Sequence, residues 1–296
     1  MELKKYLQDR SALVDQALDH WLPGVGVLPA SLHESMRYSI FAGGKRLRPI
    51  LMIAASEAVG GTAQQVMHAA CALEMIHTYS LVHDDLPAMD DDEFRRGRPT
   101  NHKVYGEATA ILAGDALLTE AFRLLADADA NRLISPATVL RVIELVARYA
   151  GSQGMVGGQV VDMESEGQEI DFPTLEYIHT HKTGGLILAS VQVGALLGGG
   201  DEEQISALTR FGGAAGLAFQ IADDILDVVG DQAELGKDIG SDQARGKATY
   251  PALLGLKEAR QRAKELCDIA VSSIDSLGAA AQTLQVLARY IVDRNS

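Results

Sequence analysis

Residues 66–85 read VMHAACALEMIHTYSLVHDD, a nearly apolar stretch that ends on two aspartates. Apolar residues occupy almost every position, which indicates a helix buried within a helical protein. Sustained period-2 alternation is absent from the chain, and helical periodicity continues on both sides of this stretch. We expect helices at about 3–22, 31–42, 47–59, 64–85, 107–127, 136–158, 173–180, 183–197, 203–229, 247–272 and 278–294. The sequence therefore predicts an all-α bundle of about ten to twelve helices.

The composition favours one large helical domain. The chain has 296 residues, and 47% of them are hydrophobic, which is enough for a substantial core. Only 5% are aromatic, while alanine and leucine abound, as suits helices better than a β-sandwich. No linker rich in proline, serine or one charge divides the chain. We expect a single domain over residues 1–296.

The net charge restricts the partners of the protein. A formal charge of −14 argues against nucleic acid, which calls for a basic patch. An acidic chain that binds an anion needs metal ions or a local basic pocket. The N-terminus lacks the features of a signal peptide, and no window is apolar enough to span a membrane. Cys71 and Cys267 are expected to be buried free thiols. We therefore expect a cytoplasmic protein without stable membrane insertion.

The first acidic cluster lies at the end of helix 64–85. Pro87 disfavours helical backbone at Leu86, so the helix should end there and Asp90 should fold back toward Asp84 and Asp85. Carboxylates at a helix C-terminus face the negative end of the dipole and need a counter-charge. Mg²⁺ fits, because it prefers oxygen and takes one or two carboxylates together with phosphate oxygens and water. The alternative is a solvated acidic loop; the EF-hand spacing is not met.

The second acidic cluster lies within LAFQIADDILDVV, residues 217–229. Asp223 and Asp227 are four residues apart and share a helix face with Gln220, while Asp224 is adjacent. Two like charges at this spacing destabilise a helix, and burying them among apolar residues is costly without a cation. The alternative is an exposed polar stripe. Two such clusters in one acidic chain favour a site for two or three metal ions more strongly than either cluster alone.

Positive charge is concentrated in GGKRLRP, residues 43–49, at the start of a helix. Backbone N–H groups at a helix N-terminus also favour anions, so the three cations Lys45, Arg46 and Arg48 form a candidate basic pocket for an anion. The segment is not a Walker A motif. Its alternative reading is a set of surface cations.

Together these residues resemble the trans-prenyl diphosphate synthases, and among them the bacterial enzymes that make farnesyl diphosphate. The resemblance rests on GGKRLRP (43–49), HTYSLVHDDLPAMDDDEFRRGRPTNHKVYGE (77–107), AGDALL (113–118), GGQVVD (157–162), HKTG (181–184), FQIADDILD (219–227) and GKDIGSDQARGKATYP (236–251). It covers nearly the whole chain. The order and separation of DDxxxxD and DDxxD make it specific.

The resemblance implies a reaction and a role for each matching residue. The reaction is Mg²⁺-dependent condensation of isopentenyl diphosphate with an allylic diphosphate, with Mn²⁺ a possible substitute. The metal ligands would be Asp84, Asp85, Asp90, Asp223, Asp224 and Asp227. Contacts to the allylic diphosphate would be Arg95, Lys182, Lys237 and Lys247. Contacts to isopentenyl diphosphate would be Lys45, Arg48, His77 and Arg96. The groups facing the allylic cation would be Lys182, Thr183 and Gln220.

The resemblance also implies an isoprenoid synthase fold around a deep central cavity, a homodimer, and control of product length just below the first cluster. Ser80 lies one turn before Asp84, and Tyr79 lies about 7.5 Å down the helix axis. A bulky Tyr79 should stop the growing chain at farnesyl diphosphate, unless it is merely core packing. The alternatives are a geranylgeranyl diphosphate synthase, a terpene cyclase, and a non-catalytic subunit or acidic cation-binding protein.

Overall fold

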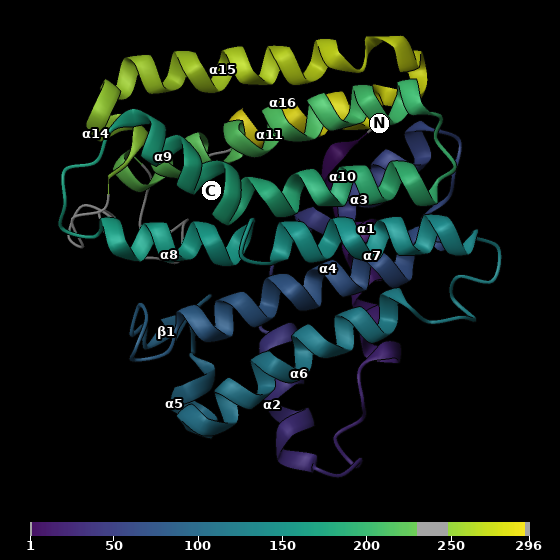
Figure 1. Ribbon diagram of the computed structural model, residues 1–296, viewed down its shortest axis with the longest axis vertical. Helices are drawn as coiled ribbons and strands as arrows, with labels where there is room; N and C mark the ends of the chain where they lie inside the picture. The colour runs from purple at the N-terminus through teal and green to yellow at the C-terminus, as the bar shows by residue number, and fades with distance from the viewer. Residues whose placement is uncertain (1, 230–247, 294–296) are drawn as a thin grey trace. The chain divides into compact units, whose positions relative to one another are not determined.

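A computed structural model describes residues 2–229 and 248–293, and it confirms the all-α class (Figure 1). Backbone contacts divide the chain into two compact units. Unit 1 comprises residues 1–50 and 64–143, and unit 2 comprises residues 51–63 and 144–296. A single domain over the whole chain stays a prediction.

Unit 1 is built on α4, Ala63–Asp84, which is the apolar stretch of the sequence. Leu73, Met75 and Ile76 are completely buried, as expected for a helix that is apolar on all sides. Helix α6 packs against both α2 and α5. The other helices of this unit are α1 (Leu3–Trp21), α2 (Ala30–Ile40), α5 (Asn101–Tyr105) and α6 (Glu107–Leu125), while α3 (Leu47–Ala58) and α7 (Pro136–Ala150) pass from one unit to the other.

A short β-hairpin follows α4, and the sequence did not predict it. Strands β1 (Phe94–Arg95) and β2 (Arg98–Pro99) pair antiparallel. The turn residues Arg96 and Gly97 have φ values of 54° and 73°. Positive φ at both positions is the conformation that a tight two-residue hairpin requires. Two-residue strands are too short to show the period-2 alternation by which strands are found in a sequence.

Unit 2 centres on the long helix α11, Glu202–Val229, which packs along α10 and α15 (Figure 1). Its remaining described elements are α8 (Met155–Ser165), α9 (Phe172–Ile178), the π-helix η1 (His179–Gly184), α10 (Gly185–Leu197), α14 (Tyr250–Leu254), α15 (Leu256–Ser273), the 3₁₀ segment η2 (Asp275–Ala281) and α16 (Gln282–Asp293). The first three of these follow one another along the chain into α10. The π-helix thus widens one turn within an otherwise helical run from Phe172 to Leu197.

Two expected helices are interrupted. The helix expected over 136–158 divides into α7, which ends at Ala150, and α8, which begins at Met155; Gly154, just before α8, is non-helical with φ −140° and ψ −126°. Within the described part of 247–272, Gly255 has a positive φ of 81° and separates α14 from α15. Glycine adopts both conformations at little cost, whereas hydrophobic periodicity continues across the breaks. No described helix is both long and apolar enough to cross a membrane.

Candidate active site

The first acidic cluster holds aspartates in two different environments. Asp84 and Asp90 are partly exposed, whereas Asp85 is only 3% exposed. The backbone N–H of Asp90 donates to the carbonyl of Asp84 at 2.8 Å, so the chain folds back here as the sequence predicted. The two partly exposed aspartates are thereby held beside each other where α4 ends.

Asp85 forms an ion pair with Arg95 from the hairpin. The Arg95 Nε atom donates to both carboxylate oxygens, at 2.7 and 3.0 Å, and its Nη2 atom lies 2.5 Å from Oδ1. Burial raises the pKa of Asp85, and the hydrogen bond and charge of Arg95 oppose that rise. In this structure the charges of an expected metal ligand and an expected diphosphate contact therefore neutralise each other.

Basic side chains of unit 1 gather near His77. The Arg96 guanidinium donates to the carbonyl of Gly43, which joins the hairpin to the GGKRLRP turn. Burial, followed by the charges of Arg48 and Arg96, holds the pKa of His77 well below its usual range. Three of the four residues expected to bind isopentenyl diphosphate thus share one neighbourhood. Lys45, the fourth, is exposed on the same turn.

Arg46, one of the three cations of that turn but given no role by the resemblance, anchors it. Its side chain is buried and donates to Asp15 at 2.8 Å, to Glu74 at 2.7 Å and to the carbonyl of Ile40 at 2.6 Å. Three cations in four positions look alike in a sequence. Only the fold shows that the middle one is committed to the interior.

The residues expected to control chain length lie one turn below Asp84. Tyr79 is 7% exposed, and its ring meets that of His83 edge-on at 5.7 Å. The Nε2 atom of His83 lies 3.0 Å from the carbonyl oxygen of Ile111 on α6, which fixes the imidazole. The Ser80 hydroxyl donates to the carbonyl of His77 at 2.8 Å within its own helix. Tyr79 supplies bulk, whereas the Ser80 hydroxyl is bonded to its own helix.

The second acidic cluster shows the same division. Asp223 and Asp227 are partly exposed on α11, whereas Asp224 is 3% exposed. Asp224 accepts hydrogen bonds from His179 Nε2 at 2.8 Å, from the backbone N–H of Tyr250 at 2.9 Å and from Gln220 Nε2 at 3.2 Å. His179 was not among the expected site residues. No sequence motif singles out a histidine at this position, three residues before Lys182.

Lys182 and Thr183 lie on the π-helix, a geometry found often at functional sites. The Lys182 ammonium group donates to Asp162 of α8 at 2.6 Å. A side chain at Gly158 would place its Cβ atom 2.3 Å from the backbone nitrogen of Lys182, so glycine permits this close approach of α8 to the π-helix. Asp162 belongs to the GGQVVD motif, which was the signal available in the sequence.

These groups surround a small cavity of about 100 Å³ in unit 2. All three residues expected to face an allylic cation line it. The lining consists of Asp162, Ile178, His179, Lys182, Thr183, Gln220, Asp224, Ala248 and Thr249. The described part of the chain thus brings Lys182, Thr183 and Gln220 together. Lys237 and Lys247, the other two lysines expected here, lie outside the described residues.

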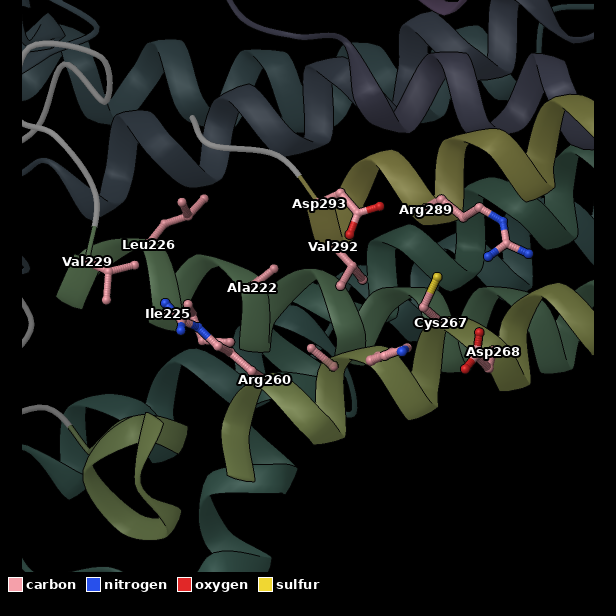
Figure 2. Close-up of a pocket in the computed structure, with 12 residues that line it drawn as sticks. Ala222, Ile225, Leu226, Val229, Arg260, Cys267, Asp268, Arg289, Val292 and Asp293 are labelled. Atoms are coloured by element: carbon pink, nitrogen blue, oxygen red, sulfur yellow. The ribbon is translucent and has the colours of Figure 1, made fainter. Parts of the chain in front are cut away.

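A larger cavity of about 480 Å³ lies between α11, α15 and α16 (Figure 2). Its α11 wall contains Ala222, Ile225, Leu226 and Val229, whose mean direction at 100° per residue is about 130° from that of Asp223 and Asp227. No residue expected at the active site is among its described lining. Cavity size alone therefore does not identify the candidate active site. The polar residues expected at that site line the smaller cavity.

The donor atoms fit Mg²⁺. No three histidine, cysteine, aspartate or glutamate side chains come together as a metal site within residues 2–229 and 248–293. Each cluster offers two partly exposed carboxylates instead. Mg²⁺ is bound in this way in phosphate-handling sites, where one or two carboxylates share it with phosphate oxygens and water.

Comparison with known proteins agrees with this geometry. Residues 29–285 match the polyprenyl synthetase family. A farnesyl diphosphate synthase of Geobacillus stearothermophilus is 50% identical over 262 residues, which are 88% of each chain. The large subunit 1 of the chloroplastic heterodimeric geranylgeranyl pyrophosphate synthase of Arabidopsis thaliana is 49% identical, over 90% of this chain and 72% of that protein. The crystal structure of a putative farnesyl-diphosphate synthase from Marinomonas sp. MED121 superposes with a TM-score of 0.85 at 42% identity, covering 99% of this chain and 100% of that one.

The chain belongs to the polyprenyl synthetase family. It is a prenyltransferase that elongates trans-prenyl diphosphates. Its relatives divide between those that make farnesyl and those that make geranylgeranyl diphosphate.

Proposed function

We propose that the protein is a Mg²⁺-dependent farnesyl diphosphate synthase, which condenses isopentenyl diphosphate first with dimethylallyl and then with geranyl diphosphate. The observation that supports the farnesyl product is Tyr79, a bulky and buried side chain whose ring is packed edge-on against His83. Its place five residues before Asp84 would put it under a substrate held at the first acidic cluster.

In this mechanism Asp84 and Asp90 of unit 1 would bind Mg²⁺, and so would Asp223 and Asp227 of unit 2, for two or three ions in all. Bound Mg²⁺ would act as a Lewis acid, neutralising the allylic diphosphate as its C–O bond breaks. The hydroxyl of Thr183 and the carbonyl of Lys182 direct their negative ends toward the allylic cation. Such oriented dipoles stabilise developing charge most strongly where water is excluded.

The basic groups of unit 1 bind the second substrate. Lys45, Arg48 and Arg96 take the diphosphate of isopentenyl diphosphate without metal. The lowered pKa of His77 keeps its imidazole neutral at pH 7, so it donates a hydrogen bond without adding charge. The double bond of isopentenyl diphosphate attacks the cation, and the departing diphosphate accepts the proton that is lost. The homodimer and the cytoplasmic location stay predictions.

A direct assay tests the proposal. Purified protein is incubated with isopentenyl and dimethylallyl diphosphates, with and without Mg²⁺, and the products are separated by chain length. We expect farnesyl diphosphate as the final product and no condensation in the presence of a chelator. Geranylgeranyl diphosphate as the main product would support the alternative instead, which the geranylgeranyl synthases among the relatives motivate. The lack of any condensation product would favour a non-catalytic subunit.

Tyr79→Ala tests the basis of chain-length control. Removing the ring opens space below Asp84, so the products should shift toward geranylgeranyl diphosphate. Tyr79→Phe is the matched control, because it keeps the ring and should keep the farnesyl product. If Tyr79→Ala still stops at farnesyl diphosphate, the ring does not limit product length.

A further inference from the structure

Asp224 lies in the second acidic cluster, but its surroundings differ from those of a metal ligand. Its side chain is 3% exposed, and both carboxylate oxygens already accept hydrogen bonds. Oδ2 accepts from His179 and from the Tyr250 backbone, and Oδ1 accepts from Gln220. Asp223 and Asp227, its neighbours on α11, remain partly exposed. Buried carboxylates are retained where hydrogen bonds satisfy them, as they do here.

The three donors come from three elements. His179 is the first residue of the π-helix, Gln220 belongs to α11, and Tyr250 is the first residue of α14. The rings of His179 and Tyr250 also contact each other, with centroids 5.3 Å apart. One carboxylate of α11 therefore holds the starts of two other elements, the π-helix and α14, against its own helix.

The consequence for the reaction follows from the position of His179. Lys182 and Thr183 come three and four residues later in the same six-residue π-helix. Any rotation of this helix about α11 would move both residues within their cavity. The hydrogen bond from His179 to Asp224 opposes that rotation at the start of the helix.

We propose that Asp224 is a positioning residue and not a metal ligand: through His179 it holds the turn that carries Lys182 and Thr183 against α11. The presence of a bound metal ion rests on the proposed function above. The hydrogen bonds of Asp224 are independent of that function, so they can be tested in protein free of metal and substrate.

Asparagine distinguishes the two roles. With its carbonyl oxygen in the place of Oδ2, the side chain introduced by Asp224→Asn still accepts from His179 and Tyr250. Its NH₂ group then faces Gln220, whose amide can turn to present its oxygen. Asp224→Asn therefore preserves all three hydrogen bonds while it removes the charge that a Mg²⁺ ligand needs. Asp224→Ala removes both.

The first measurement is hydrogen exchange at the Tyr250 amide in metal-free protein. Asp224→Ala should accelerate this exchange by roughly tenfold or more, because a hydrogen bond to a charged acceptor is lost. Asp224→Asn should leave it near the parent rate. Tyr250→Phe is the control for changes in the ring: it keeps the backbone N–H, so residue 250 should still exchange near the parent rate. Exchange of the π-helix amides of residues 179–184 is followed in the same samples and should also accelerate in Asp224→Ala; unchanged exchange there would overturn the proposal.

The second measurement is metal binding. The titration uses Mn²⁺ with inorganic diphosphate, followed by electron paramagnetic resonance. Asp224→Asn should bind Mn²⁺ like the parent, whereas Asp223→Asn should bind about tenfold or more weakly, a difference of about 1.4 kcal/mol. Equal weakening in both variants would overturn the proposal, because Asp224 would then act as a ligand. If the parent binds no Mn²⁺, the proposed function fails, and the exchange experiment still decides the role of Asp224.

Discussion

At the residue scale, one of the three aspartates expected to bind metal in each acidic cluster is buried and the other two are partly exposed. Asp85 is paired with Arg95, and Asp224 with His179 and Tyr250. A run of acids in a sequence does not distinguish these environments, because the distinction depends on side chains brought in from other segments. Burial also changes proton binding by side chains. The buried Tyr79 is the case for which a stability measurement can detect this change.

The stability of the protein should fall at high pH partly because of Tyr79. Burial, aided by the charge of Asp84, raises the pKa of Tyr79 to about 12, above the value near 10 of an unfolded tyrosine. The folded state keeps the proton to higher pH, so this contribution is complete below pH 10 and is lost as pH rises through 12. Between about pH 10 and 12 the free energy of unfolding should fall by up to about 1.4 kcal/mol per pH unit.

Urea denaturation between pH 9 and 11.5 measures this slope. Tyr79→Phe keeps the ring and has no proton to lose, so its slope should be smaller than that of the parent. Below pH 9 the two proteins should show the same pH dependence. Equal slopes above pH 10 would contradict the assignment to Tyr79.

At the element scale, the π-helix carries Lys182 and Thr183, two of the groups proposed to face the allylic cation. It lies between α9 and α10, and it packs against both α8 and α11. The close approach of α8 depends on Gly158, where a Cβ atom would lie 2.3 Å from the nitrogen and 2.8 Å from the Cα atom of Lys182. Both clashing atoms belong to backbone, which moves less readily than the end of a side chain.

Gly158→Ala should therefore destabilise the protein by about 1–3 kcal/mol and slow turnover, because Lys182 must move. Gly213→Ala is the matched control. Gly213 is exposed on α11 with nothing within 4 Å of the added Cβ, so alanine should stabilise that helix by about 0.5–1 kcal/mol. Urea denaturation and steady-state rates measure both effects. A Gly158→Ala protein as stable and active as the parent would show that α8 is free to shift.

At the scale of the whole molecule, the chain carries a charge of −14 and acts on substrates that are themselves anions. Lys45, Arg48 and Arg96 supply positive charge in unit 1, and Lys182 is already paired with Asp162 in unit 2. Binding of an allylic diphosphate beside the acidic clusters should therefore require a divalent cation.

Thermal unfolding tests this dependence. Mg²⁺ and inorganic diphosphate together should raise Tm more than the sum of their separate effects, because only the ternary complex stabilises the folded state. Saturation at about one hundred times Kd corresponds to about 2.7 kcal/mol. Asp223→Asn should lose most of the combined shift. An equal shift from diphosphate without Mg²⁺ would show that metal is unnecessary for binding.

The sequence predicted the all-α class and most helix positions, because hydrophobic periodicity is local and survives in every buried helix. It did not predict the β-hairpin or the breaks at Gly154 and Gly255. These depend on backbone dihedrals of a few residues, which periodicity does not register. For the site, the spacing of DDxxxxD and DDxxD identified the family and its reaction.

Only the tertiary structure showed the different environments of individual residues within each motif. It showed that Arg46 is committed to the interior, that Asp85 is neutralised by Arg95, and that Asp224 is held by His179 and Tyr250. The physical reason is the same each time. Whether a charged group faces a ligand or a partner depends on which distant segment packs against it, and no local pattern in the sequence contains that information.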